Sequence, residues 1–288
     1  MTPEPSLTLV VATLGRVEAL KRLLTSVAPQ LRADDTVVVV AQAALEEITA
    51  LAQEVDTAAN ILCVPSERGA TRGRNTGVAA TARGSFLIFP NDTTWFPDGS
   101  IEAIRANAGQ DVLVYTVRDD AGPKFSFPER SEPLNYRNVW DVIEPGFGIR
   151  RAAFEAIDGF DPLIGTGAPS PWQAGEVADL LYRWQLHSGN APIQWAPAIE
   201  VGGITDSAGL ADSERRRKLR AYGRGCGRVM SRYRAPLWFR AAYVVAGLFV
   251  AVKRPGLYRL SDGWFAAIGR CEGTTGHLFG GGFDAVTK

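Results

Sequence analysis

The chain has 288 residues, of which 46% are hydrophobic and 22% are charged, and its 31 basic side chains balance 31 acidic ones. This composition supports a globular protein with a substantial core and excludes an intrinsically disordered one. A formal net charge of zero also argues against a general nucleic-acid-binding protein, so we expect no nucleic-acid partner.

Residues 1–98 alternate between the patterns of buried strands and those of helices. Apolar, β-branched runs predict strands at residues 7–12, 37–40, 61–64 and 86–89. Apolar residues at helical spacing predict helices at 17–31 and 43–55, and a glycine-rich turn that leads into a helix is expected over 69–82. This alternation predicts a parallel sheet with helices on both faces.

Polar residues follow three of the predicted strands, at positions 13–16, 41–42 and 91–93. In parallel α/β sheets, ligands bind beyond the carboxyl ends of the strands. We therefore expect these three segments to converge on one site.

Residues 99–210 are less regular. Strands are expected at 111–117 and 193–201, and a helix at 176–187. Residues 146–151 lead into a further short helix, which ends near Gly159. The connections are a Pro-, Ser- and charge-rich loop at 122–136 and a Gly- and Pro-rich loop at 165–175.

The character of the chain changes after residue 210. Residues 213–234 hold nine Arg or Lys against one Glu, and residues 236–252 are strongly apolar. A helix would align Arg220, Arg224, Arg228 and Arg232 in one basic stripe, although three glycines nearby weaken that helix. The apolar segment is shorter than the roughly 20 residues of a spanning helix. It predicts either an element at an anionic membrane surface or a helical pair that covers the core.

Cysteine content and the N-terminal residues predict a cytoplasmic protein. Cys63, Cys226 and Cys271 are odd in number and far apart, so they predict no disulfide framework or zinc knuckle and favour a reducing compartment. The first residues contain no basic segment followed by a long apolar one, as a signal peptide would.

Five segments occur in a characteristic order. They are LTLVVATLGRVEALKRLLTSV at 7–27, GATRGRNTGVAATARGSFLIF at 69–89, FPNDTTWFPDGS at 89–100, GFGIRRAAFEAIDGFDP at 146–162 and GTGAPSPWQAGEVADLLYR at 165–183. Together they resemble family 2 glycosyltransferases of the GT-A fold. RAYGRGCGRVMSRY at 220–233, with PLWF after it, is similar to bacterial members that act in polysaccharide assembly.

The resemblance implies an α/β fold with a mixed, mostly parallel sheet flanked by helices. It implies a GT-A domain at 1–210, with a nucleotide-binding half at about 1–98 and an acceptor half at about 99–210, and a C-terminal helical extension at 211–288. It also implies an inverting glycosyltransferase that moves a sugar from a nucleotide-diphosphate donor to a glycan or lipid-linked acceptor in cell-surface polysaccharide synthesis. Such an enzyme would lie peripherally on the cytoplasmic face of the membrane.

Arginines are the first candidate donor-binding residues. A guanidinium makes bidentate contacts with phosphate, and a helix N-terminus adds backbone donors. Arg72 and Arg74, in the glycine-rich turn, match this chemistry, although a solvated basic loop would look the same. By resemblance Thr13 and Arg16 also belong to the donor site. Gln42 stands where many relatives keep an Asp that contacts the nucleoside.

Asn91, Asp92 and Thr93 stand where the family carries its Asp-x-Asp metal signature, and we assign all three to the donor site. Only Asp92 brings a carboxylate, so Mg²⁺ or Mn²⁺ would bind weakly and with the donor's phosphates, or Arg16 and Arg74 would neutralise the diphosphate instead. A plain Asn-Asp turn is the alternative.

Glu176 begins the predicted helix at 176–187, where helix donors favour a carboxylate, and Asp179 follows on the same face. The resemblance makes Glu176 the catalytic base and Asp179 the second candidate, although acids are common at helix starts. Trp172 would stack on an acceptor sugar, or it would hold its own loop in place.

Two other functions are compatible with the sequence. A non-catalytic relative that binds nucleotide or a partner enzyme is favoured by the reduced Asp-x-Asp segment and by Val177, which stands where the family commonly has a second acid. A nucleotidyltransferase-like enzyme is disfavoured by the acidic helix start at Glu176.

Overall fold

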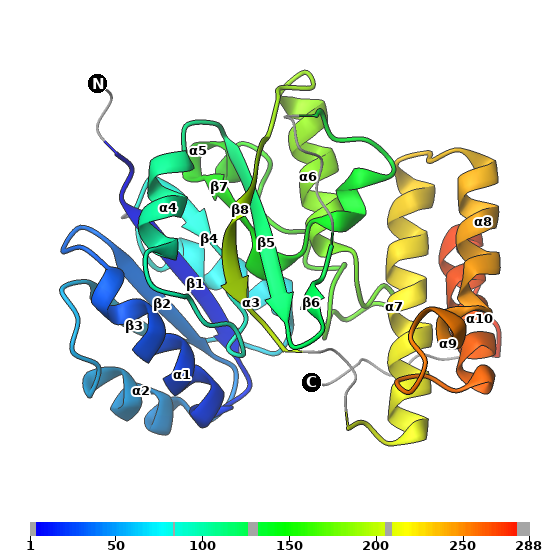
Figure 1. The fold of residues 1–288 in the computed structure, drawn as a ribbon, viewed down its shortest axis with the longest axis horizontal. Coiled ribbons are helices and arrows are strands. Elements are labelled where there is room, and N and C mark those ends of the chain that lie inside the picture. The colour runs from blue at the N-terminus through cyan, green and yellow to red at the C-terminus, as the bar shows by residue number, and fades with distance from the viewer. Residues whose placement is uncertain (1–3, 83, 126–131, 205–208, 281–288) are drawn as a thin grey trace. The chain divides into compact units, whose positions relative to one another are not determined.

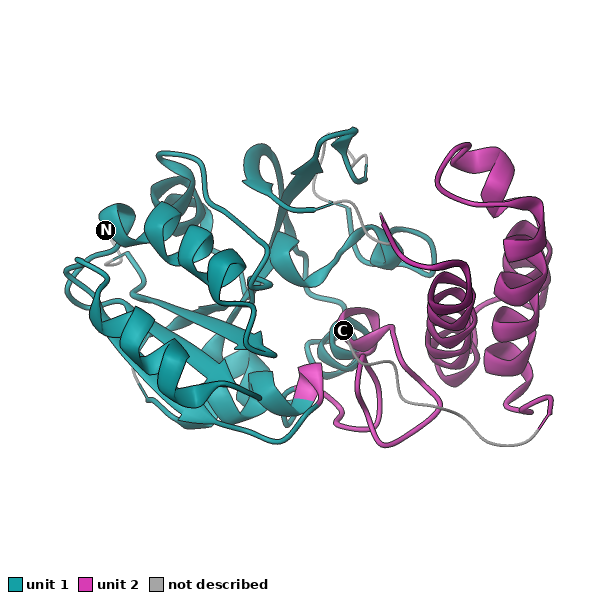
Figure 2. Ribbon diagram, turned by 90° about the horizontal axis from the view of Figure 1, so that it is seen from below, with its two compact units in different colours: residues 1–68, 72–159, 180–205 teal, residues 69–71, 160–179, 206–288 magenta. Residues whose placement is uncertain are grey.

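The computed structural model describes residues 4–82, 84–125, 132–204 and 209–280 (Figure 1). The expected loop at 122–136 therefore lies partly outside the described residues, at 126–131. The chain forms two compact units, which are described separately (Figure 2). Unit 1 comprises residues 1–68, 72–159 and 180–205, and unit 2 comprises 69–71, 160–179 and 206–288.

Unit 1 is built on one mixed sheet. In the described residues its strands are β1 (Leu7–Thr13), β2 (Thr36–Ala41), β3 (Asn60–Pro65), β4 (Phe86–Ile88), β5 (Val112–Asp119), β6 (Gly122–Pro123), β7 (Phe147–Arg150) and β8 (Gln194–Gly202). Their order is β3-β2-β1-β4-β7-β5-β6, with β8 paired to β5. The first four strands are parallel, β7 is antiparallel to both of its neighbours, and β8 is parallel to β5.

The helices of unit 1 cover both faces of this sheet. Leu9 and Val11 of β1 face the apolar sides of α1 (Val17–Val27), α2 (Leu45–Gln53) and α4 (Ser100–Asn107). The alternate residue Val10 faces α3 (Ala70–Ala79), where a Cβ on Gly77 would lie 2.4 Å from Val10 Cγ1. The glycine therefore permits a close approach of helix to sheet.

The predicted α/β class is confirmed, with differences in detail. The predicted helix at 17–31 ends earlier, because Pro29 lies in a separate 3₁₀ turn, η1 (Ala28–Gln30). Strand β7, helix α4 and the 3₁₀ turns η2 (Asn138–Asp141) and η3 (Glu144–Gly146) were not predicted. Helix α5 (Arg151–Glu155) also belongs to unit 1. Helix α6 (Glu176–His187) begins in unit 2 and continues in unit 1.

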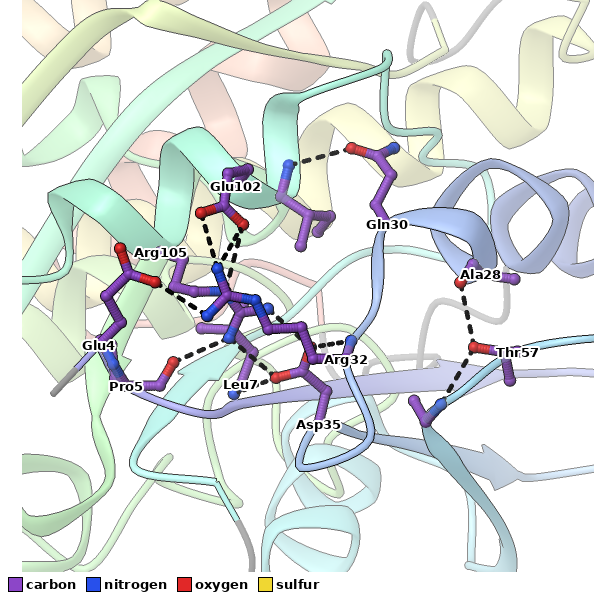
Figure 3. Close-up of polar contacts among 12 residues, drawn as sticks. Glu4, Pro5, Leu7, Ala28, Gln30, Arg32, Asp35, Thr57, Glu102 and Arg105 are labelled. Atoms are coloured by element: carbon purple, nitrogen blue, oxygen red, sulfur yellow. Dashed lines mark hydrogen bonds and ion pairs between the residues drawn. The ribbon is translucent and has the colours of Figure 1, made fainter.

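A buried ion pair fixes the amino-terminal edge of β1 and β2 (Figure 3). The two terminal guanidinium nitrogens of Arg105, a residue of α4, donate to the two carboxylate oxygens of Asp35 at 3.0 and 2.7 Å. Both side chains are fully buried. Asp35 also accepts from the backbone N–H of Leu7, at 2.8 Å, and Arg105 donates to the carbonyl of Pro5. The pair thus joins α4, the start of β1 and the turn before β2.

Unit 2 contains α7 (Asp212–Arg232), α8 (Leu237–Gly247), α9 (Val250–Lys253) and α10 (Leu260–Thr275). Glycines bring α7 and α10 into backbone contact. A Cβ on Gly269 would lie 2.1 Å from the Arg220 carbonyl oxygen, and one on Gly227 would lie 2.8 Å from the Thr274 nitrogen. The glycines that weaken α7 in isolation therefore stabilise its packing.

The predicted basic stripe of α7 is engaged inside unit 2. Arg220 and Arg224 donate to the buried carboxylate of Glu272. Burial raises the pKa of Glu272, but these hydrogen bonds outweigh it and lower the pKa to about 2. Arg228 lies over the Trp172 ring and Arg232 contacts Asp161. Arg220 and Arg224 are thus held inside unit 2, whereas Arg228 and Arg232 keep exposed side chains, and contact of this stripe with lipid stays a prediction. No helix in the described part of the chain has the length and hydropathy needed to cross a bilayer.

We expect Arg105→Met to destabilise unit 1 by about 3–5 kcal/mol, because it leaves the Asp35 carboxylate buried without its cation. Urea denaturation followed by circular dichroism measures this loss. Arg32→Ala is the matched control, since Arg32 is exposed and pairs with the exposed Glu4 and Glu102. Equal losses in the two variants would show that the buried pair does not hold the sheet edge.

Candidate functional site

The carboxyl ends of β1, β2 and β4 meet at one edge of the sheet in unit 1. Thr13 at the end of β1 pairs with Ala41 at the end of β2. Leu9 of β1 pairs with Ile88, the last residue of β4, so the segment after β4 runs beside the end of β1. The structure thus brings together the three polar segments that the sequence analysis placed on one site.

Asp92 is the centre of this edge. It is 1% exposed, and its Oδ2 accepts from the Thr13 hydroxyl at 2.8 Å and from Arg16 Nε at 2.9 Å. A second Arg16 nitrogen donates to Oδ1, so the guanidinium binds the carboxylate in a bidentate manner. The Arg16 side chain is 43% exposed. One edge of the guanidinium therefore neutralises Asp92 while the side chain stays accessible to solvent.

The turn after β1 explains how Arg16 reaches Asp92. Gly15 has φ 89°, a left-handed conformation that favours glycine, and a Cβ there would lie 3.1 Å from Ala44 Cβ. The Thr13 hydroxyl accepts from the backbone N–H of Gly15 at 3.3 Å and of Arg16 at 3.4 Å. Gly15 is thus what allows this tight turn.

Arg74 lies on the other side of the same segment. It is 4% exposed, donates to Asn91 Oδ1 at 3.2 Å, and lies 3.7 Å from the carboxylate of Glu144. This burial rules out the solvated-loop interpretation for Arg74. Sequence reasoning missed Glu144, because a single Glu in an irregular segment carries no motif.

Arg72 and Arg74 lie inside α3 rather than in a turn before it, which corrects the predicted boundary. The helix starts early because its glycines fit against the sheet: a Cβ on Gly73 would lie 3.0 Å from Ala12 Cβ. Unlike Arg74, Arg72 is exposed and pairs with Glu67.

Gln42 and Thr93 complete the predicted donor residues. Gln42 Nε2 donates to the carbonyl of Glu67 at 2.8 Å, so its amide is oriented toward the segment that precedes α3. Thr93 is half-buried, and its backbone carbonyl accepts from Arg22 at 2.9 Å. The backbone N–H of Thr94 donates to the Asn91 carbonyl at 2.9 Å. The segment 91–94 is therefore a turn as well as a candidate binding loop.

The oxygens of this cluster do not fit a divalent cation as they stand. Both Asp92 oxygens accept from Arg16, and Asn91 Oδ1 accepts from Arg74. Within the described residues, no group of three or more His, Cys, Asp or Glu side chains lies close enough to hold a metal ion. The Arg16 guanidinium, held by both oxygens of Asp92, supplies the positive charge beside this carboxylate.

The predicted catalytic acids lie in unit 2. Glu176, the first residue of α6, is 5% exposed, and a Cβ on Gly165 would lie 3.2 Å from its carboxyl carbon. Asp179 is fully buried and accepts from the Tyr233 hydroxyl at 2.8 Å and from Arg232 at 3.2 Å. Asp179 is thus held by α7 and its following residue.

The loop that precedes α6 is held by its own side chains. Gln173 is buried, accepts from the backbone N–H of Gly167 at 2.9 Å and donates to the carbonyl of Ala168 at 2.8 Å. The half-buried Trp172 has the Arg228 guanidinium 5.2 Å from its ring centre. Sequence reasoning missed Gln173, since a single buried amide has no sequence signature.

Several solved structures have a fold similar to that of the chain. No protein-family model and no curated protein matches the chain. TarS 1–349 of S. aureus, solved in complex with UDP-GlcNAc, matches with a TM-score of 0.56 and 13% identity over 95% of this chain and 93% of that fragment. The chain has a GT-A fold.

Two further structures agree. The mannosyltransferase PcManGT from Pyrobaculum calidifontis, in complex with GDP-Man and Mn²⁺, matches with a TM-score of 0.55 and 14% identity over 94% of this chain and 88% of that one. GalNAc-T7 with UDP, GalNAc and Mn²⁺ matches with a TM-score of 0.54 and 14% identity over 96% of this chain and 56% of that one. At these identities the similarity establishes the fold alone.

Proposed function

We propose that the protein is a glycosyltransferase that binds a nucleotide-diphosphate sugar at the carboxyl ends of β1, β2 and β4. The observation that carries this proposal is the convergence of two arginines from different elements on adjacent residues. Arg16 binds Asp92, and Arg74 binds Asn91. The solved structures that share the fold include complexes with UDP, UDP-GlcNAc and GDP-Man.

The charge of this edge suits a diphosphate. A guanidinium has five N–H donors in a planar fork, and Asp92 engages Nε and one terminal nitrogen of Arg16. The remaining donors of this partly exposed side chain can bind a phosphate oxygen. Arg74 adds a second positive charge and orients the Asn91 amide, so we assign both arginines to the donor site.

We further propose that Arg16 supplies the positive charge that a divalent cation would otherwise supply. The carboxylate of Asp92 then positions Arg16 rather than a metal. PcManGT and GalNAc-T7 were solved with Mn²⁺, so the chain would differ from these structures in how it neutralises the phosphates. This assignment follows from the contacts of Asp92 and from the neutral Asn91 and Thr93.

For the transfer step we propose Glu176 as the general base of an inverting reaction. The proposal is based on the family resemblance of the segment 165–183 and on the position of Glu176 at the start of α6. The acceptor oxygen would form the bond to the anomeric carbon as the bond to the diphosphate breaks, and Glu176 would take the hydroxyl proton. The start of α6 favours its carboxylate form. Asp179 is committed to Arg232 and Tyr233, so we assign it a positioning role. Trp172 remains our proposed acceptor contact.

The acceptor and pathway are proposals from the resemblance: a glycan or lipid-linked acceptor, cell-surface polysaccharide synthesis, and the cytoplasmic face of a membrane. A non-catalytic protein that binds nucleotide or a partner enzyme is the second candidate. It is favoured by the neutral side chains of Asn91 and Thr93 and by Val177. Neither form of the second candidate transfers sugar, and its partner-binding form does not require a nucleotide site.

We expect Arg74→Ala to weaken nucleotide-diphosphate binding at least tenfold, or about 1.4 kcal/mol. The variant loses a guanidinium that would bind the diphosphate and that also holds the Asn91 side chain. Isothermal titration with UDP, GDP and dTDP measures this effect, and thermal melting confirms that the variant folds. Arg72→Ala, two residues away on the exposed side of α3, is the matched comparison. A larger loss in Arg72→Ala than in Arg74→Ala would move the phosphate site to the exposed arginine.

We expect the parent protein to bind nucleotide with the same affinity, within about threefold, in EDTA and in Mn²⁺. Arg16→Ala should weaken binding in EDTA and should make it respond to Mn²⁺, because Asp92 is then free to bind a cation. In the parent, Asn91→Asp with Thr93→Asp should introduce Mn²⁺ binding. Loss of parent nucleotide binding in EDTA, restored by Mn²⁺, would contradict the role of Arg16.

A further inference from the structure

Unit 2 exposes an apolar face that the proposed sugar transfer does not use. Its large side chains lie along α8 and α9 and at the start of α10. They are exposed by 52–78%, and we define the apolar face by these six residues: Trp238, Val245, Phe249, Val252, Leu260 and Trp264. For a water-exposed surface this is an unusual concentration of large apolar groups.

The six residues lie on successive elements of unit 2. Trp238 and Val245 are seven residues apart on α8, so they lie on one side of that helix, while Phe249 and Val252 lie at the start of α9 and within it. The inner side packs on α10: a Cβ on Gly247 would lie 2.8 Å from Ala267, and one on Gly263 would lie 2.4 Å from the Leu248 carbonyl. This contact places the end of α8 against the first turns of α10, which carry Leu260 and Trp264.

The charges near the apolar face are mostly basic, and one of them, Arg259, is paired with Asp212 of α7. Between residues 233 and 271 the basic residues are Arg234, Arg240, Lys253, Arg254, Arg259 and Arg270, and the sole acid is Asp262. Asp262 is fully buried and accepts from Arg215 and Arg216. Lys253 and Arg254 are both exposed. The surface is therefore apolar with a basic border.

We propose that this apolar face docks on an anionic lipid bilayer, with α8 lying in the plane of the interface. Apolar side chains would enter the boundary between headgroups and acyl chains, Trp238 and Trp264 would sit at headgroup level, and Lys253 and Arg254 would contact lipid phosphates. With eleven residues, α8 is too short to span the membrane.

A second copy of the chain fits the surface less well. In a two-fold dimer each face would meet itself, and the basic borders of both copies would lie around one interface. The exposed Lys253 and Arg254 of both copies would lie at that interface, and these like charges would repel. Anionic lipid supplies the opposite charge.

This inference rests on the proposal that the acceptor lies at a membrane, but its test involves no sugar transfer. The purified full chain should sediment with vesicles of phosphatidylcholine and phosphatidylglycerol, more than with phosphatidylcholine alone, and added salt should release part of it. Lipids brominated on their acyl chains should quench tryptophan fluorescence, and Trp264→Phe should reduce that quenching.

Two variants separate the apolar and electrostatic contributions. Phe249→Ser with Trp264→Ser should weaken vesicle binding at least tenfold, and Lys253→Glu with Arg254→Glu should remove the preference for phosphatidylglycerol. The controls are Leu186→Ser, at a side chain that is 74% exposed on α6, and Lys21→Glu, on the exposed side of α1. Neither control should change binding to vesicles, and none of these variants should change nucleotide affinity.

Absence of binding to either vesicle, or equal losses in the control variants, would overturn the inference. A different result would also overturn it: the parent protein is a dimer by light scattering and does not bind vesicles, and Phe249→Ser with Trp264→Ser converts that dimer to a monomer. In each case nucleotide binding by unit 1 would be unaffected, so the failure of lipid docking is distinguishable from failure of the proposed donor site.

Discussion

The parallel register of β1 between β2 and β4 is the constraint on which the candidate site depends. It aligns Thr13 with the end of β2 and brings the segment after β4 beside it. At the opposite edge, the buried pair of Asp35 and Arg105 ties the starts of β1 and β2 to α4. Because the strands are fixed at one end by this pair, the polar groups at the other end are held on a rigid scaffold.

The contact between Arg16 and Asp92 then decides the electrostatics of the site. In a buried position the carboxylate needs a cation, and the guanidinium supplies it in bidentate geometry. A divalent ion at the same place would have to displace Arg16. The same chain uses this solution in unit 2, where Glu272 and Asp262 are each buried and each held by two arginines. Arginine–carboxylate pairing is thus a recurrent way in which this protein buries charge.

The sequence predicted the parts of the fold that rest on apolar periodicity. The runs that became β1 and β2 are long and β-branched, so they were recognised. Strand β7 was missed because it is four residues long and contains Gly148, whose absent Cβ makes room for Phe86. Helix α10 lies within the predicted helical extension at 211–288, but its bounds were not predicted, because its glycines weaken a helix in water and fit against α7 and the end of α8.

In the site, residue types at the strand ends were predictable from position. Their pairings were not, since no spacing rule relates Arg16 to Asp92, which lies 76 residues away. Amide hydrogen exchange with and without UDP, GDP or dTDP tests the central claim most directly. The account predicts slower exchange on nucleotide binding at residues 13–16, 41–42, 72–75 and 91–94. Nucleotide binding that protects none of these segments, or no binding of any of the three nucleotides, would contradict it.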